Sequence, residues 1–449
     1  MHCVFASIMI VLFFRVFAVV IAVGKRPVSF RTRKLSLPAR MVLHSIGCGR
    51  VSHCRNICEM ERPEGLSIAR LRAFLHSGVA ASRAYDGAMS TFDLLSLRLP
   101  IVQAPMAGGP STPALAAAVS DAGGLGSLAT GYLTAEAAQT QLETFRSLSE
   151  GPVSVNVFVP EAQAPAEPDV RAYRESLAAW AEREGVEGTI PPVPSPGQTE
   201  WDTYADLLAM LVRTVPEVVT FTFGLPEKDV VLSLQAAGVL VGVTVTSVLE
   251  ARAAVSHGAD LLIAQGIEAG GHRSQFDQSA EPVEVTALEL VRSLLAELDA
   301  PVIAAGGVDS EASAARLMEA GAAAVQLGTL FLTTEEAGTK PTHRAALLSG
   351  EARRTVLTRV FTGRPARALE NHFTRQMGEH AVTGYPHVHV LTGGIRAHAA
   401  AADDREHLHL WAGTGYAACT VESAASVLDR FASLRRGDAP HPAAEAGTP

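Results

Sequence analysis

The chain has 449 residues, of which 48% are apolar and 18% are charged, and its formal net charge is −9. This length suits one barrel-sized domain with additions better than three small domains. The acidic balance gives no reason to expect nucleic acid or an anionic membrane as a partner.

The first 88 residues differ from the rest of the chain. They hold 13 Lys and Arg against 4 Asp and Glu. They also hold four of the five cysteines, at a spacing that matches no zinc-binding pattern. Cys419 is alone in the remaining sequence, which excludes a disulfide framework there and favours a cytoplasmic location.

Residues 3–23 form an apolar run that is long enough for a membrane span. Arg15 lies near its middle, which costs about 2.5–3.5 kcal/mol on insertion scales. The basic cluster follows the run instead of preceding it, unlike in a signal peptide. Two explanations stay open. Translation starts at Met89 and residues 1–88 are an artefact, or residues 3–23 are an anchor that leaves the body on the cytoplasmic side.

From residue 99 onward, short β-branched or apolar runs alternate with helical patterns. The eight runs are residues 100–106, 125–130, 153–159, 218–224, 240–245, 260–266, 301–307 and 323–329. Eight strand–helix units in series predict an α/β fold, a closed parallel (β/α)8 TIM barrel. The alternative is an open, doubly wound sheet, which usually has fewer and less evenly spaced strands.

The expected domain organisation follows from these patterns. The barrel takes residues 89–335, a smaller, mainly helical substrate-covering domain takes 336–412, and a C-terminal helix that closes on the barrel takes 413–437. Residues 438–449 are expected to be a disordered tail. A proline-rich excursion, residues 160–198, follows the third strand and is either a rim or lid over the site or a plain surface insertion.

Active sites of such barrels lie at the carboxyl ends of the strands. The strand ends of this chain offer amides, glycines and one hydroxyl, which suit a flat polar ring and a phosphate. Glycine loops after the seventh and eighth strands, at Gly306–Gly307 and at Gln326–Thr329, predict a phosphate site with bare backbone N–H groups.

His272 follows Gly270 and Gly271 at the end of the sixth strand. It is either an ordinary solvated side chain or a general base or donor toward a developing anion. No second histidine or carboxylate lies nearby at metal-ligand spacing, and the later histidines are irregularly spaced, so no metal is expected.

Six ordered blocks resemble the nitronate monooxygenases, formerly called 2-nitropropane dioxygenases, from about Leu99 to about Gly415. The blocks are PIVQAPMAGGPSTPALAAAVSDAGGLGSL, NVFVP, QGIEAGGHRS, PVIAAGGVDS, VQLGTLFL and FTGRPARAL. The resemblance implies a barrel that holds FMN without a covalent bond and uses dioxygen to oxidise alkyl nitronates, possible substrates including propionate 3-nitronate, to carbonyl compounds and nitrite. Such an enzyme serves detoxification.

The resemblance also implies roles for single residues. His272 matches the active-site histidine of the family. Tyr385 and His389 are four residues apart in a later block, so they share a face if that segment is helical, and they either line the substrate side or serve packing. Arg273 either steers an anionic substrate or makes an outward salt bridge, and Ser274 replaces a glycine that is frequent in the family. The cofactor contacts implied are Ala104, Pro105, Met106, Gly108, Asn156, Gln265, Gly270, Gly271, Gly306, Gly307, Gln326, Leu327, Gly328 and Thr329.

Two rival functions stay open. An FMN-dependent enoyl-acyl-carrier-protein reductase shares the barrel and a similar Gly-Gly-His, but it needs NAD(P)H. A non-catalytic flavin- or phosphate-binding protein would make His272 incidental. The expected partners are therefore a small-molecule nitronate and O2, with no nucleic acid and no metal. A membrane is a partner only if residues 3–23 are an anchor, and the sequence leaves oligomerisation open.

Overall fold

The computed structural model describes residues 92–161, 165–194, 199–351 and 354–436. In the first 91 residues it describes two short strands, β1 (Met9–Ile10) and β2 (Val19–Val20), which pair antiparallel. Apart from these two strands, the apolar run 3–23 lies outside the described residues, and so does the expected disordered tail. Within the described part of the chain, no helix is long and apolar enough to cross a membrane.

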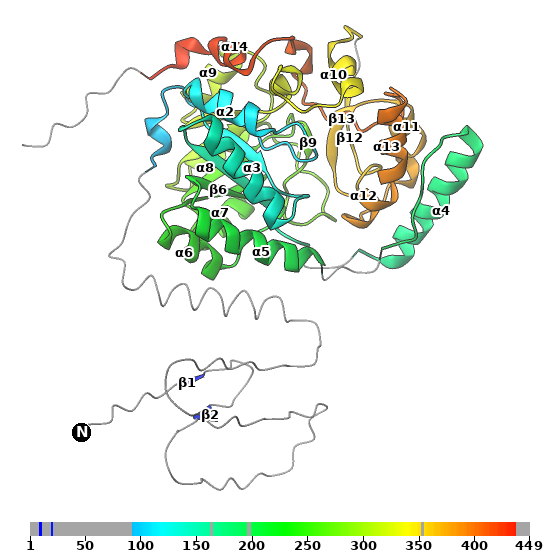
Figure 1. Ribbon diagram of the computed structural model, residues 1–449, viewed down its shortest axis with the longest axis horizontal. Coiled ribbons are helices and arrows are strands. Elements are labelled where there is room, and N and C mark those ends of the chain that lie inside the picture. Colours follow the sequence, from blue (N-terminus) through cyan, green and yellow to red (C-terminus); the bar gives the residue numbers. More distant parts are fainter. Residues whose placement is uncertain are drawn as a thin grey trace, which may run out of the picture. The chain divides into compact units, whose positions relative to one another are not determined.

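Eight parallel strands form the central sheet, as the sequence predicted (Figure 1). Their order around the sheet is β3-β11-β10-β8-β7-β6-β5-β4. The strands are β3 (Ile101–Gln103), β4 (Gly126–Ala129), β5 (Val153–Phe158), β6 (Val218–Thr222), β7 (Leu240–Val245), β8 (Leu261–Gln265), β10 (Val302–Ala305) and β11 (Ala324–Leu327).

A parallel bridge between Val102 and Leu125 joins the first and last strands of this order and closes the barrel. The Gln103 side chain reinforces the closure, because its amide donates to the Ser127 carbonyl at 3.0 Å and accepts from the Ser127 N–H at 3.1 Å. Gln103 is fully buried by these contacts. The TIM-barrel prediction is therefore confirmed.

Helices connect successive strands and cover the outside of the barrel (Figure 1). Side chains of Ser or Thr cap the first turns of α2, α3, α7, α8 and α9, which is why these helices begin where they do. The helices are α2 (Pro113–Asp121), α3 (Ala135–Leu148), α5 (Thr199–Thr214), α6 (Lys228–Ala236), α7 (Val248–Ser256), α8 (Ala287–Leu295) and α9 (Glu311–Glu319).

A second module stands beside the barrel mouth and comes from several parts of the chain (Figure 1). It contains α10 (Pro341–Leu348), β12 (Thr355–Thr358), β13 (Ala366–Leu369), α11 (His372–Gln376), η3 (Gly378–His380), α12 (His387–Leu391) and α13 (Gly393–Ala401). The segment 336–412 is thus mainly helical, as expected. It also contains a small antiparallel sheet that was not predicted, in which β9 (Gly271–His272) pairs with β13.

The excursion after β5 belongs to this module. Its helix α4 (Glu167–Glu184) buries Tyr173, Leu177 and Trp180 against residues of the covering segment such as Phe361 and Phe373. Of the two expectations, a rim element fits and a plain surface insertion does not.

The C-terminal segment is less helical than expected. The helix α14 (Ala424–Asp429) is six residues long and is capped by Ser423, while η4 (Tyr416–Ala418) and η5 (Ala432–Leu434) are single turns. The stretch before Ser423 contains Gly413 and Gly415, and glycine disfavours a helix. The helix still packs on the barrel through Leu428 and Val427, which lie in the main core.

Candidate active site

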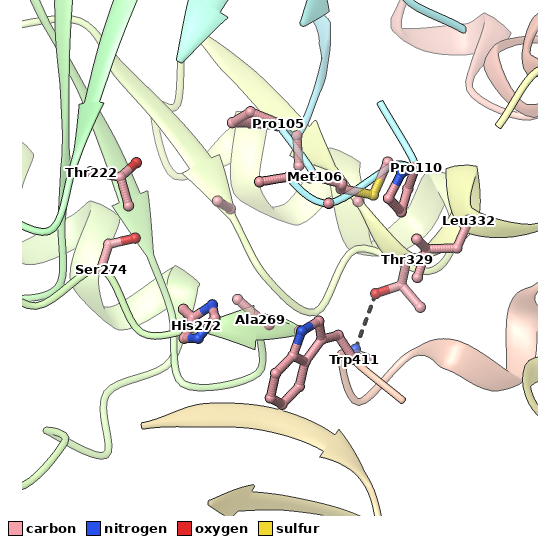
Figure 2. Close-up of a pocket in the computed structure, with 18 of the residues that line it drawn as sticks. Pro105, Met106, Pro110, Thr222, Ala269, His272, Ser274, Thr329, Leu332 and Trp411 are labelled. Carbon is pink, nitrogen blue, oxygen red and sulfur yellow. Dashed lines mark hydrogen bonds between the residues drawn. The ribbon is translucent and has the colours of Figure 1, made fainter. Parts of the chain in front are cut away.

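A cavity of about 480 Å³ opens at the carboxyl ends of the barrel strands, beneath the covering segment. Its volume is in the range of small-molecule and cofactor sites. Among the predicted residues that line it are His272, His389, Ala104, Pro105, Met106, Gly108, Asn156, Gln265, Gly270, Gly271, Gly306, Gly307, Gln326, Gly328 and Thr329. Figure 2 shows this wall, with Met106 and Thr329 opposite His272.

Two predicted residues do not line the cavity. Successive side chains of a strand point to opposite faces, so Gln326 faces the cavity while Leu327 is buried in the core outside the barrel. Tyr385 lies behind the wall, with its ring centroid 5.9 Å from that of His272 and 6.4 Å from that of His389. The expected proximity of Tyr385 and His389 is thus present, but only His389 reaches the cavity.

His272 is positioned by both modules. Its backbone pairs with Ala366 of β13, and its Nε2 lies 2.9 Å from Thr362 Oγ1. Aromatic rings enclose the imidazole, with centroid distances of 5.7 Å to Phe223 and 5.3 Å to Trp411. A lone solvated side chain is therefore not what the structure shows.

Burial lowers the pKa of His272 to about 3, and the positive charges of Arg364 and Arg396 and the nearby His389 add to the effect. The imidazole is consequently neutral at physiological pH. A neutral ring has one N–H donor and one acceptor nitrogen, so it is equipped for proton transfer or for hydrogen bonding to an anion.

Phe223 holds an uncommon backbone conformation beside this histidine. Its φ is +77°, which is rare for a non-glycine residue and costs free energy. The surroundings enforce it, because the Phe223 ring packs on Phe158 and lies under the Arg364 guanidinium, whose carbon is 4.1 Å from the ring centroid. The strain places an aromatic wall against His272.

The two glycines before His272 serve different purposes. A Cβ on Gly270 would lie 2.4 Å from the backbone nitrogen of Gly413 and 2.6 Å from the carbonyl carbon of Ala412. Gly270 is thus required by the protein's own chain, although it also lines the cavity. Gly271 has a φ of +72° and open space around its Cβ position.

Gln265 is held in one orientation by its neighbours. Its side-chain amide donates to the His272 carbonyl at 3.0 Å and accepts from Ser274 N and from the Arg273 guanidinium. Arg273 is buried, does not line the cavity and forms no ion pair with any described residue, so neither expected role matches its position. Ser274 has no positive φ, so its Cβ does not strain the loop.

The strand ends offer complementary polar groups. The side-chain amide nitrogen of Asn156 donates hydrogen bonds to the carbonyl and hydroxyl oxygens of Thr220 and to the hydroxyl oxygen of Thr222. Its side-chain oxygen, Oδ1, has no partner among the described residues and is not sealed from the cavity. The side-chain amide of Gln265 donates only one of its two N–H groups. The second N–H of Gln265, as a donor, and Oδ1 of Asn156, as an acceptor, therefore remain for a ligand.

The glycine loops form the opposite end of the cavity. The N–H groups of Gly307 and Val308 have no hydrogen-bond partner among the described residues. The Thr329 hydroxyl accepts from Gly413 N at 3.0 Å, which leaves its proton to donate. Glu268 is the only carboxylate among the described lining residues, and it accepts from Ala287 N at the start of α8. Backbone donors thus dominate this end.

The covering segment adds positive charge to the wall. Lys340 and Arg396 line the cavity and have no carboxylate partner among the described residues. Arg396 is buried, and it donates to the His389 carbonyl at 2.6 Å and to Thr392 Oγ1 at 3.1 Å. The pKa of Lys340 is lowered mainly by burial and, to a smaller extent, by repulsion from Arg396.

His343 and His409, which the sequence did not single out as lining residues, accompany these cations and His389. Burial lowers the pKa of His343 to about 4 and that of His389 to about 3, and it holds the pKa of His409 well below its ordinary value. Three or more His, Cys, Asp or Glu side chains that could share a metal ion are not found together in the described part of the chain.

Sequence reasoning missed much of the cavity wall. Phe158 ends β5 and Phe223 follows β6, so their positions at strand ends were a usable signal. Tyr132 follows the end of β4 and carried the same signal. Trp411, Lys340 and Arg396 carried no local signal, because the fold of the covering segment brings them to the cavity. Tyr132 stacks on His389 with a centroid distance of 4.9 Å and joins the barrel to this segment.

Fold and cavity together define a (β/α)8-barrel protein whose ligand site lies at the carboxyl ends of the strands, under a covering segment. Residues 91–433 match the profile of the family described as nitronate monooxygenase. The chain belongs to this family, and it is accordingly an oxidoreductase.

Relatives and solved structures agree with this assignment. A nitronate monooxygenase of Pseudomonas aeruginosa is 38% identical over 348 residues, which cover 77% of this chain and 98% of the relative. One of Paraburkholderia phytofirmans is 40% identical over 289 residues, 64% of this chain and 78% of the relative. The structure of a nitroalkane oxidase from Streptomyces ansochromogenes superposes with a TM-score of 0.71 at 42% identity and covers 76% and 96% of the two chains.

A second solved structure is FabK from Thermotoga maritima, with a TM-score of 0.58, 26% identity and coverage of 76% and 94%. The family and the nitroalkane oxidase neighbour support oxidation of nitro compounds as the general activity.

Proposed function

We propose that the protein is an FMN-dependent nitronate monooxygenase, which oxidises alkyl nitronates with O2 to carbonyl compounds and nitrite. The observation that carries the proposal is one continuous cavity with bare backbone donors at one end and a neutral, aromatic-enclosed His272 at the other. The first end suits a phosphate, and the second suits a small nitro compound.

The cavity residues fit FMN by their chemistry. The N–H groups of Gly307 and Val308 and the hydroxyl of Thr329 would bind the phosphate, as glycine loops commonly do at this place in a barrel. The free oxygen of Asn156 and the remaining N–H of Gln265 offer an acceptor and a donor to the polar edge of a flavin ring. Ala104–Met106 would border the ring.

When bound, FMN supplies the redox chemistry, and the protein supplies position and electrostatics. His272 orients the nitro group, and it accepts the proton from the adjacent carbon when the substrate arrives as a neutral nitroalkane. Phe223 and Trp411 exclude water from the surroundings of His272, which strengthens each polar contact there.

The unpaired cations of the covering segment support an anionic substrate. A buried guanidinium without a carboxylate partner is costly, and a bound anion compensates for it. Arg396 and Lys340 would attract a nitronate and would bind the carboxylate of a substrate such as propionate 3-nitronate. The likeness to proteins named nitronate monooxygenase supports the same class.

The enoyl-acyl-carrier-protein reductase is the second candidate, because the FabK structure shares the fold and 26% of its sequence. The higher identity and TM-score of the nitroalkane oxidase favour the monooxygenase. The placement of the cysteines, with the free and buried Cys419 alone after residue 88, supports a cytoplasmic location.

The test replaces His272 with Gln in the full-length protein and measures bound FMN and turnover of a nitronate. FMN stays bound and turnover falls by about 10²–10⁴-fold if His272 acts on the substrate. Unchanged turnover would remove His272 from the mechanism. Retained FMN with no turnover in either protein, on any nitronate, would favour the non-catalytic flavin-binding alternative.

A further inference from the structure

We propose that Thr362 is a positioning residue that fixes the tautomer of His272. In this arrangement Nε2 of His272 carries the proton and donates it to Thr362, and Nδ1 faces the substrate as an acceptor. The inference rests on the proposed function in one respect, namely that the substrate binds beside His272.

The hydrogen-bond directions follow from proton counting. Thr362 Oγ1 lies 2.9 Å from His272 Nε2 and 3.3 Å from the Arg364 carbonyl oxygen, and it accepts from the Arg364 N–H at 3.4 Å. A hydroxyl has one proton and accepts with its lone pairs. If Nε2–H donates to Thr362 and Thr362 donates to the Arg364 carbonyl, every donor has an acceptor. In the reverse direction, the hydroxyl and carbonyl oxygens would face each other without a proton.

The other ring nitrogen is left to the cavity. His272 Nδ1 has no hydrogen-bond partner among the described residues, and it is not among the polar atoms sealed inside the protein. Since the ring lines the cavity, Nδ1 is the nitrogen that a substrate meets. The rings of Phe223, Tyr385 and Trp411 surround the imidazole and oppose a ring flip.

The loop that carries Thr362 is held firmly in place. Arg364 is fully buried, forms an ion pair with Glu161 and donates to the Gln275 carbonyl at 2.6 Å. Gly363 has a φ of +83°, and a Cβ there would lie 2.5 Å from the Gly384 carbonyl carbon. Thr362 itself is 1% exposed. The acceptor offered to Nε2 is therefore fixed before a substrate arrives.

The arrangement has a chemical consequence for neutral nitroalkanes. The C–H bond next to the nitro group breaks, its proton moves to Nδ1, and its electron pair moves onto the nitro group to give the nitronate. The imidazolium that forms keeps its Nε2–H bond to Thr362. A preformed nitronate needs no such transfer, so the tautomer matters less for it.

The experiment reads the tautomer directly. The full-length protein is labelled with ¹⁵N-histidine, and long-range ¹H–¹⁵N correlation spectra are recorded for the wild type, Thr362→Ser and Thr362→Val, with His272→Gln to assign the signal. The wild type and Thr362→Ser should show a protonated Nε2 and an unprotonated Nδ1. Thr362→Val, which removes the acceptor at nearly constant volume, should show a mixture of both tautomers.

Turnover gives the second reading. Thr362→Val should lower kcat for a neutral nitroalkane by about 10–100-fold, and Thr362→Ser should restore most of it. The loss on the preformed nitronate should be smaller. A protonated Nδ1 in the wild type, or an unchanged tautomer in Thr362→Val, would overturn the proposal. If Thr362→Val does not fold, the wild-type spectrum still decides. Because the tautomer is read without turnover, failure of the proposed function on every nitronate is a separate result.

Discussion

Replacing Gly270 with Ala tests the close approach of two backbone segments next to the cavity. The added Cβ would lie 2.4 Å from Gly413 N, so the segments must separate by about 1 Å to reach ordinary contact. Backbone atoms, unlike side chains, cannot relieve the clash by changing rotamer. We therefore expect the free energy of unfolding to fall by about 3 kcal/mol, near the upper end of the range for overpacked cores. The melting temperature, measured by calorimetry, should fall by roughly 5 °C.

The separation would also disturb the site. The segment beyond Ala412 donates from Gly413 N to Thr329 Oγ1 and from Thr414 N to the Glu268 carbonyl, and both bonds would lengthen. FMN affinity should therefore fall together with stability. Gly271→Ala is the matched control, because it meets nothing within 4 Å and costs about 1–2 kcal/mol for its φ of +72°. A Gly270→Ala protein that melts like the wild type, or like this control, would refute the reasoning.

Three further predictions concern charge, pH and the phosphate end. Lys340→Met should raise KM for propionate 3-nitronate by about 10-fold and KM for an uncharged-chain nitronate much less, and equal effects in steady-state assays would argue against carboxylate binding. The four cavity histidines have folded pKa values below their unfolded ones, so they contribute stability above about pH 6.5 that is lost as pH falls. At pH 5.5 the loss should be about 1 kcal/mol per histidine, and a melting temperature that is flat from pH 7.5 to 5 would contradict this. Thr329→Val should weaken FMN binding by about 10-fold, as measured by fluorescence titration, whereas unchanged affinity would place the phosphate elsewhere.

The sequence predicted those parts of the fold that depend on local patterns. The eight strands are short apolar runs, which the residues themselves indicate. The position of His272 after two glycines at a strand end predicted that it would lie at the carboxyl ends of the strands, and it lines the cavity there. Leu327 shows the limit of this reasoning. It was grouped with its neighbours in one motif, but the alternation of a strand turns it to the other face.

Long-range contacts account for what could not be predicted. The pairing of β9 with β13 joins residues about 95 positions apart, and α4 packs on a segment nearly 200 residues later, at separations where no local pattern carries information. The same holds for Arg396 and Lys340, which resemble ordinary surface residues in the sequence. Gly270 was correctly expected near the site, but only the structure shows that the Ala412–Gly413 backbone is what requires it.

The most direct test of the proposed function is an oxygen-uptake measurement on the purified full-length protein, preceded by its absorption spectrum. The account predicts a yellow protein that consumes O2 with an alkyl nitronate alone, at a rate that NADPH does not change. A yellow protein whose flavin bleaches with NADPH and which ignores nitronates would point to the enoyl reductase instead. A colourless protein that does not take up FMN would contradict the account.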